Sequence, residues 1–139
     1  MGRLLGIDLG TRRIGLALSD ASRLISSPFD TLTYRGDRDL VRRLADLAAE
    51  HDVDKVVIGL PLREDGSEGP GCVRARQIAG LLEKRGVEAV LWDERWSSLR
   101  AEELLREGGL DRRRGIHKID KVAASLILED YMNSTHKKD

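Results

Sequence analysis

The chain has 139 residues, of which 40% are hydrophobic and 35% are charged. We expect residues 1–139 to form a single domain, because this length supplies one hydrophobic core but not two. Lys and Arg total 24, and so do Asp and Glu. The formal net charge is therefore zero, and any site for a polyanion must be a local patch. Cys72 is the only cysteine, which excludes an internal disulfide and favours a reducing, cytoplasmic location. No apolar run is long enough to span a membrane, so we expect no membrane association.

The first half of the chain shows the patterns of strands and then of a helix. Two apolar segments on either side of a Gly10–Arg13 turn predict a β-hairpin, and a third strand is expected within Ser26–Tyr34. Apolar residues then recur at helical spacing up to His51, with Asp37 as the predicted N-cap. A short buried strand follows at 55–60, and the Gly- and Pro-rich segment after it is predicted to be a loop.

The second half alternates helices and strands. We expect a helix that ends at Gly86, a strand at 88–93, a helix at about 98–107, an irregular segment at 108–115, and a last helix from about His117 to Met132 with a frayed tail. This order predicts an α/β fold with a mixed five-stranded sheet. Its first three strands should be antiparallel and the others parallel, joined by right-handed helical crossovers.

Three acidic residues stand out by their positions on these elements. Asp8 ends the first strand and Glu94 follows the last one, at the carboxyl edge where open α/β sheets bind their ligands. Asp120 falls on the stripe of the last helix that contains Ala123 and Ala124, which should pack on the sheet, whereas Ser125 falls on the opposite face. A carboxylate on a packed face is costly without a partner. A cation shared by the three acids would supply that partner.

Hard divalent cations such as Mg²⁺ or Mn²⁺ take oxygen ligands, and a pair of them can stabilise an in-line phosphodiester displacement. We therefore predict that Asp8, Glu94 and Asp120 are both catalytic residues and metal ligands, with Asp93 as an open fourth candidate. The alternative is structural: Asp8 caps a turn, Glu94 pairs with Arg95 or Arg13, and Asp120 caps a helix.

Four segments, "GIDLGTRRIGLALSD", "VVIGLPLREDGSEGPG", "DERWSS" and "KIDKVAASLILEDYM", resemble the YqgF/RuvX family of RuvC-like nucleases. The resemblance spans nearly the whole chain and implies an RNase H-like fold. It also implies a cytoplasmic nuclease that trims the 5′ end of the 16S rRNA precursor, or alternatively a Holliday junction resolvase acting on DNA. The family's catalytic acids fall on Asp8, Glu94 and Asp120. Trp96 is bulkier than the residue expected after "DER".

Two other classes of protein compete with a nuclease. "GIDLGT" also resembles the first phosphate hairpin of actin-like and sugar-kinase ATPases, where backbone amides approach phosphate oxygens. Those proteins close two such domains on a nucleotide, whereas this length supplies one. A non-catalytic nucleic-acid-binding module on the same fold is the third class, and a metal-dependent cleavage assay separates it from an enzyme.

Basic residues near the three acids are the candidates for binding nucleic acid. Such contacts to phosphates fix the register of a substrate without reading its bases, so they do not distinguish RNA from DNA. RNA is favoured only through the family resemblance, and the protein is expected to be a monomer or a weak homodimer. The candidates flank Asp8 and Asp120 in the sequence: Arg12, Arg13, Arg112, Arg113, Arg114, Lys118 and Lys121.

Overall fold

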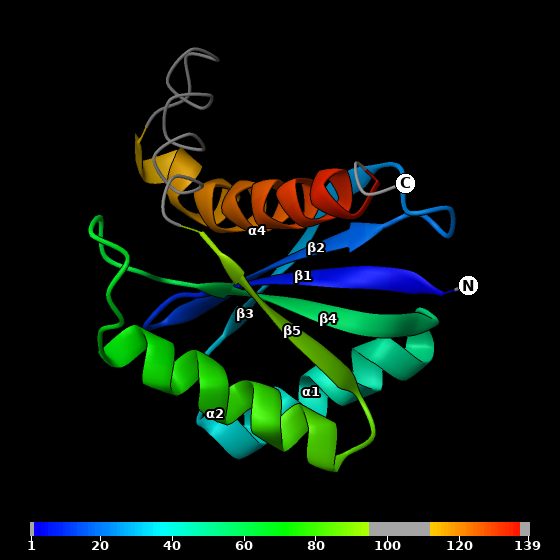
Figure 1. The fold of residues 1–139 in the computed structure, drawn as a ribbon, viewed down its shortest axis with the longest axis horizontal. Helices are drawn as coiled ribbons and strands as arrows, with labels where there is room; N and C mark the ends of the chain where they lie inside the picture. Colours follow the sequence, from blue (N-terminus) through cyan, green and yellow to red (C-terminus); the bar gives the residue numbers. More distant parts are fainter. Residues whose placement is uncertain (1, 95–111, 137–139) are drawn as a thin grey trace.

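A computed structural model describes residues 2–94 and 112–136, and the side chains of 112–119 and 136 are not described. Five strands form one sheet in the order β3-β2-β1-β4-β5, with α4 on one face and α1 and α2 on the other (Figure 1). The elements run β1 (Arg3–Leu9), β2 (Arg13–Ser19), β3 (Ser26–Thr33), α1 (Asp37–Glu50), β4 (Val53–Leu60), α2 (Pro70–Lys84), β5 (Glu88–Asp93) and α4 (Arg112–His136).

The sheet is mixed, as the sequence predicts. β1 pairs antiparallel with β2, and β2 pairs antiparallel with β3. On the other side of β1, β4 and then β5 add as parallel strands. The carboxyl ends of β1, β4 and β5 therefore meet at one edge of the sheet, and the β1–β2 hairpin places Asp8 opposite Gly15 near this edge.

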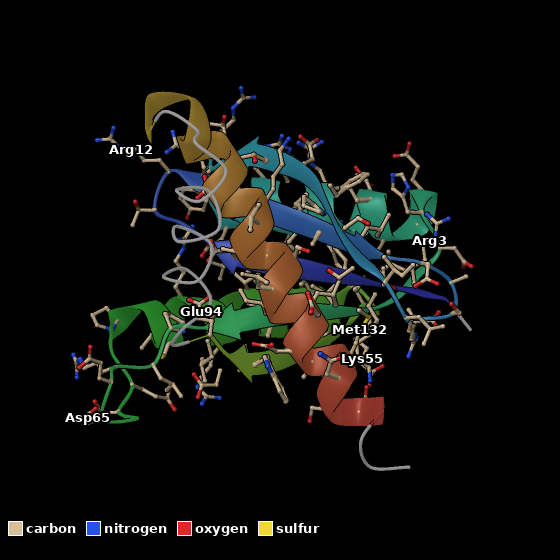
Figure 2. All side chains as sticks on the ribbon, turned by 90° about the horizontal axis from the view of Figure 1, so that it is seen from above. Arg3, Arg12, Lys55, Asp65, Glu94 and Met132 are labelled. Atoms are coloured by element: carbon tan, nitrogen blue, oxygen red, sulfur yellow. The ribbon has the colours of Figure 1, made fainter. Side chains whose placement is uncertain are left out.

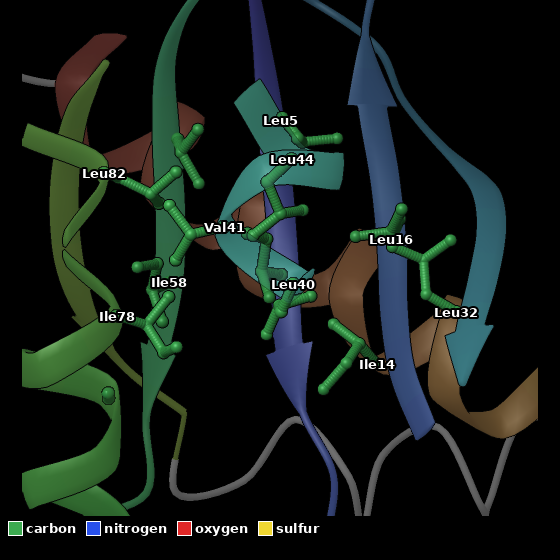
Figure 3. Packing of buried hydrophobic residues seen from close by; sticks show 13 residues of the cluster. Leu5, Ile14, Leu16, Leu32, Leu40, Val41, Leu44, Ile58, Ile78 and Leu82 are labelled. Atoms are coloured by element: carbon green, nitrogen blue, oxygen red, sulfur yellow. The ribbon is translucent and has the colours of Figure 1, made fainter. Parts of the chain in front are cut away.

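Each face of the sheet carries its own hydrophobic core. On one face, side chains from β1, β2 and β4 pack with those of α1 and α2, among them Leu5, Leu16, Leu44 and Ile78 (Figure 3). On the other face, α4 packs against Leu4, Ala17 and Val57 through a second set of buried side chains: Ala124, Ile127, Leu128, Tyr131 and Met132. No helix among residues 2–94 and 112–136 is long and apolar enough to cross a membrane.

The last helix is longer than the sequence pattern indicates. α4 begins at Arg112 and continues to His136, so residues 112–116 are helical instead of irregular, and the predicted tail begins as a further turn of helix. Arg is a good helix former, and one Gly in a helix costs only about 1 kcal/mol. Docking of the helix on the sheet outweighs this cost. The predicted helix at 98–107, with Trp96 before it, lies outside the described residues.

Two further details correct the sequence interpretation. The N-cap of α1 is Gly36, and Asp37 is the first helical residue, whose carboxylate accepts a hydrogen bond from the Tyr34 hydroxyl at 2.7 Å. Ser125 is buried instead of exposed, because β3 also packs on α4 and Ser26 donates to the Ser125 carbonyl at 2.9 Å. α2 ends at Lys84 with Arg85 as its C-cap, and the predicted glycine comes one residue later: Gly86, at φ 80°, donates its N–H to the Glu83 carbonyl.

Candidate active site

The carboxyl edge of the sheet brings Asp8 and Glu94 together. Asp8 is the penultimate residue of β1. Glu94 follows β5 directly, held by a backbone hydrogen bond of 3.2 Å from its N–H to the Leu60 carbonyl of β4. Arg12 and Asp65 lie at the same end of the sheet as Glu94, whereas Arg3, Lys55 and Met132 lie toward the other end (Figure 2). Three neighbouring strands thus define the position of this pair of acids.

Both carboxyl groups hold protons more tightly than usual. Burial raises the pKa of Glu94 to about 8, and the negative charge of Asp8 adds to the shift. Burial also raises the pKa of Asp8 to about 6, with a smaller contribution from the charge of Asp120 and an opposing one from hydrogen bonding with Glu94. These directions are those of two like charges taken out of water side by side. A nearby cation would reverse both effects.

Gly59 provides the space that Glu94 occupies. A Cβ atom at position 59 would lie 2.2 Å from Oε2 of Glu94 and 2.8 Å from Cδ1 of Ile127 on α4. Oε2 is buried and has no hydrogen-bond partner among the residues that the structure describes. A buried carboxylate oxygen that lacks a partner is costly, so this atom marks a place where a ligand would be stabilising.

Asp120 reaches the same edge from α4, which covers the face of the sheet where Gly59 and Glu94 meet Ile127. It lies within α4, about two turns past Arg112. This position excludes the helix-capping alternative. Its Oδ2 accepts a hydrogen bond of 3.1 Å from Nε of Arg13, which belongs to β2, and this ion pair is partly exposed. One structural alternative paired Arg13 with Glu94. In the structure Arg13 pairs with Asp120 instead.

Close packing of α4 on the hairpin fixes the height of Asp120 above the sheet. A Cβ atom at Gly15 would lie 2.0 Å from the backbone carbonyl oxygen of Asp120. Gly15 is the residue opposite Asp8 in the hairpin. The absence of a side chain at this one position thus lets Asp120 approach the strand that holds Asp8.

The side chains of the three acids are not arranged as a complete metal-binding site in this structure. Among residues 2–94 and 112–136, no three His, Cys, Asp or Glu side chains converge closely enough to hold a metal ion. Asp8 and Glu94 are adjacent, and Asp120 influences Asp8 electrostatically while its carboxylate points to Arg13. The structure brings the predicted acids to one edge but leaves the third in an ion pair.

The basic candidates divide into two groups. Arg12 is exposed in the turn, Arg13 pairs with Asp120, and Lys121 is partly buried on α4. The side chains of the others lie outside the described residues, although their backbone belongs to α4: Arg112, Arg113, Arg114 and Lys118.

Sequence reasoning missed Arg74, which reaches the hairpin from α2. Its Nη1 donates to the Gly10 carbonyl at 2.6 Å, and its guanidinium lies 4.4 Å from the centre of the Tyr34 ring. Arg74 and Arg76 are the two basic residues in the first turns of α2, and nothing in the sequence separates Arg74 from Arg76, which pairs with Glu68.

Comparison with known proteins identifies the family. The family model of RuvX, described as Holliday junction resolvase, matches residues 2–134. The chain belongs to the RuvX family. A Pelotomaculum thermopropionicum protein named "Putative pre-16S rRNA nuclease" is 41% identical over 134 residues, which cover 95% of this chain and 87% of the relative. A RuvX relative with the same name from Myxococcus xanthus is 40% identical over 138 residues, covering 99% and 91%.

Solved structures agree on the RuvX fold. RuvC of T. thermophilus in complex with a Holliday junction substrate has a TM-score of 0.57 at 16% identity, and the match covers 98% of this chain and 96% of that one. The large terminase nuclease from the thermophilic phage G20c has a TM-score of 0.57 at 15% identity, covering 93% and 81%. The predicted family and the predicted mixed RNase H-like sheet are both confirmed.

The raised pKa of Glu94 predicts how stability depends on pH in a metal-free buffer with chelator. The folded-state value of about 8 exceeds the ordinary 4.5, so this group's contribution is fully present below pH 4.5 and is lost as the pH rises through 8. The free energy of unfolding of wild type, measured in urea, should therefore fall between about pH 5 and 8. Glu94→Gln should remove most of that slope. Equal slopes in the two proteins would contradict the assignment of the shift to Glu94.

Proposed function

We propose that this RuvX protein, acting as one nuclease domain over residues 1–139, is a divalent-metal-dependent endonuclease that hydrolyses phosphodiester bonds in 5′-end processing of precursor 16S rRNA. The observation that best supports this proposal is the buried pair of Asp8 and Glu94 at the carboxyl edge of the sheet, where the pKa of each carboxyl group is raised. Two curated relatives of at least 40% identity carry a name for that activity. Because bacterial rRNA precursors are made in the cytoplasm, this proposed substrate favours a cytoplasmic location. We also propose that the protein is a monomer or weak homodimer.

The donor set suits Mg²⁺ or Mn²⁺. Asp8, Glu94 and Asp120 supply only carboxylate oxygens, the donors that hard divalent cations prefer. Oε2 of Glu94 is buried without a hydrogen-bond partner in the described part of the chain, and burial beside like charge raises the pKa of both Asp8 and Glu94. When bound, two such ions would stabilise the attacking and leaving oxygens of phosphodiester hydrolysis.

The chain's own residues would position the substrate and the acids. Arg13 holds Asp120 at the edge through the 3.1 Å ion pair, and it leaves Asp8 and Glu94 as the two adjacent acids. Asp120 would complete the set by exchanging Arg13 for a cation, because both compete for its carboxylate. Arg12, exposed in the neighbouring turn, would contact a substrate phosphate.

Arg12 gives a prediction about salt. Arg12→Ala should weaken binding of a single-stranded RNA at low salt and reduce the slope of log affinity against log salt by about 0.7, the loss expected for one phosphate contact. Arg3→Ala is the matched control, since Arg3 lies at the other end of the sheet (Figure 2). Binding is measured by fluorescence anisotropy between low and physiological salt. Equal slopes for the two variants would remove Arg12 from the binding surface.

A second candidate function is resolution of Holliday junctions, because the matching family model carries that description. The deciding experiment incubates the protein with Mg²⁺ or Mn²⁺ and either a 5′-extended 16S rRNA fragment or a four-way DNA junction. We expect cleavage of the RNA near its mature 5′ end and none of the junction. Cleavage of the junction alone would replace the proposed function with the second candidate, and cleavage of neither would contradict both.

A further inference from the structure

Arg74 and Tyr34 contact the β1–β2 turn from two elements outside the hairpin. Arg74, in the first turns of α2, donates from Nη1 to the Gly10 carbonyl at 2.6 Å. Tyr34, just after β3, donates its backbone N–H to the Arg12 carbonyl at 2.8 Å. The guanidinium of Arg74 stacks on the Tyr34 ring at 4.4 Å, within cation–π distance. Both halves of the turn are therefore held by one stacked pair.

The stacked pair of Arg74 and Tyr34 is itself held by a contact with α1. The Tyr34 hydroxyl donates to Asp37 at the start of α1 at 2.7 Å. Nη2 of Arg74 is buried and has no hydrogen-bond partner within residues 2–94 and 112–136. A guanidinium with an unsatisfied buried N–H persists only where its other contacts compensate for the cost. The Gly10 bond and the Tyr34 ring are the described contacts that do so.

The turn connects the pair to the acidic edge by short links. The Gly10 N–H donates to the Asp8 carbonyl at 3.1 Å, so a single residue separates the Arg74 contact from the proposed metal ligand. Gly10 is itself confined, because a Cβ atom there would lie 2.3 Å from the Arg13 carbonyl oxygen. At the other end of the turn, Arg13 carries the ion pair to Asp120. Movement of the turn would therefore disturb both Asp8 and the ion pair between Arg13 and Asp120.

We propose that Arg74, stacked on Tyr34, is a positioning residue that holds the β1–β2 turn so that Asp8 and the Arg13–Asp120 pair keep their places at the site. Its effect on catalysis rests on the proposed nuclease function, but its effect on the turn does not. Arg74 acts through the Gly10 carbonyl and has no contact with substrate in this assignment. The planar guanidinium of Arg can stack on the Tyr34 ring and donate to the Gly10 carbonyl at the same time, whereas the ammonium group of Lys cannot stack in this way.

The test compares Arg74→Met, which keeps the aliphatic stem but removes the donor, with Arg74→Lys, which restores charge and one donor. Arg76→Met on the same helix is the control, because Arg76 pairs with the exposed Glu68. Hydrogen exchange of the backbone amides of residues 9–13 reports on the turn without any substrate. We expect about tenfold faster exchange there in Arg74→Met, since 1.4 kcal/mol of lost restraint is a factor of ten. We expect partial recovery in Arg74→Lys and no change in Arg76→Met.

Cleavage kinetics supply the functional readout. In Arg74→Met, kcat should fall about ten- to a hundredfold from misplacement of the acids while KM changes little. Unchanged exchange at 9–13 in Arg74→Met would overturn the proposal, as would a purely KM effect with kcat intact. Should wild type cleave neither nucleic acid, the nuclease function fails, while the exchange experiment still decides the role of Arg74. If Arg74→Met does not fold, Arg74→Lys decides. Faster exchange confined to residues 9–13 in Arg74→Lys would support the proposal, and unchanged exchange there would overturn it.

Discussion

Asp8→Asn should lower metal-dependent cleavage by about a hundredfold or more, because it removes charge from the centre of the acidic edge, and tenfold in rate corresponds to only 1.4 kcal/mol. The amide retains the shape of the side chain but is a poor ligand for a hard cation. Without metal, the variant should be as stable as wild type or slightly more so, since burial and the charge of Asp120 already disfavour the ionised Asp8. The measurements are initial cleavage rates on precursor rRNA and urea unfolding in chelator.

Asp46→Asn is the control for Asp8→Asn. It makes the same change of charge at an exposed position on α1 and should leave cleavage unchanged. Near-wild-type cleavage by Asp8→Asn would refute the assignment of Asp8 as a ligand. A large loss of stability in that variant would instead show that the carboxylate has a structural role.

Among substitutions of a glycine by alanine near the site, Gly15→Ala should lower the free energy of unfolding most. Its Cβ would lie 2.0 Å from the Asp120 backbone oxygen, and a backbone atom of a long packed helix cannot turn aside as a side-chain end can. We expect a loss of about 1–3 kcal/mol or more in the free energy of unfolding, as for overpacked cores. Cleavage should also fall, because α4 must rise and carry Asp120 with it.

Gly80→Ala is the matched control for Gly15→Ala. Gly80 is exposed in α2, and a Cβ atom there meets nothing within 4 Å. This substitution should stabilise the protein by about 0.5–1 kcal/mol through the helical preference of Ala. Urea unfolding of both variants tests the pair. Equal stability of Gly15→Ala and wild type would mean that α4 does not sit on the hairpin as closely as the structure shows.

The sequence predicts Asp8 and Glu94 at one edge because both follow apolar strands, and parallel strands end together. It also places Asp120 on the packed side of a helix, because periodicity shows which residues share a face. Periodicity does not show what a residue meets across the interface. Arg13 and Asp120 are 107 positions apart, and their pairing depends on how closely α4 approaches β2.

Other features depend on tertiary contacts that a local pattern does not contain. The sequence pattern does not indicate the start of α4 at Arg112, because Gly115 interrupts it, and docking of α4 on the sheet outweighs the weak preference of Gly against helix. The helical pattern predicts one buried face and leaves Ser125 on the other, whereas in the structure β3 covers a second face of α4 and buries Ser125. The sequence does not indicate the role of Arg74, because its hydrogen-bond partner is the backbone carbonyl of Gly10, and a backbone partner cannot be recognised from the pattern of side chains.

The central claim is that Asp8, Glu94 and Asp120 together hold divalent cations. Its most direct test is the rise in melting temperature with Mn²⁺ concentration for wild type, Asp120→Ser and Arg13→Gln. Ligand binding to the folded state stabilises it by about 2.7 kcal/mol at a hundred times Kd. The metal-induced rise is compared instead of the absolute melting temperature, because Asp120→Ser also breaks the ion pair with Arg13. We expect a clear rise in wild type, at least as large a rise in Arg13→Gln, which frees Asp120, and little rise in Asp120→Ser. Equal metal-induced rises in wild type and Asp120→Ser would remove Asp120 from the site and contradict the claim.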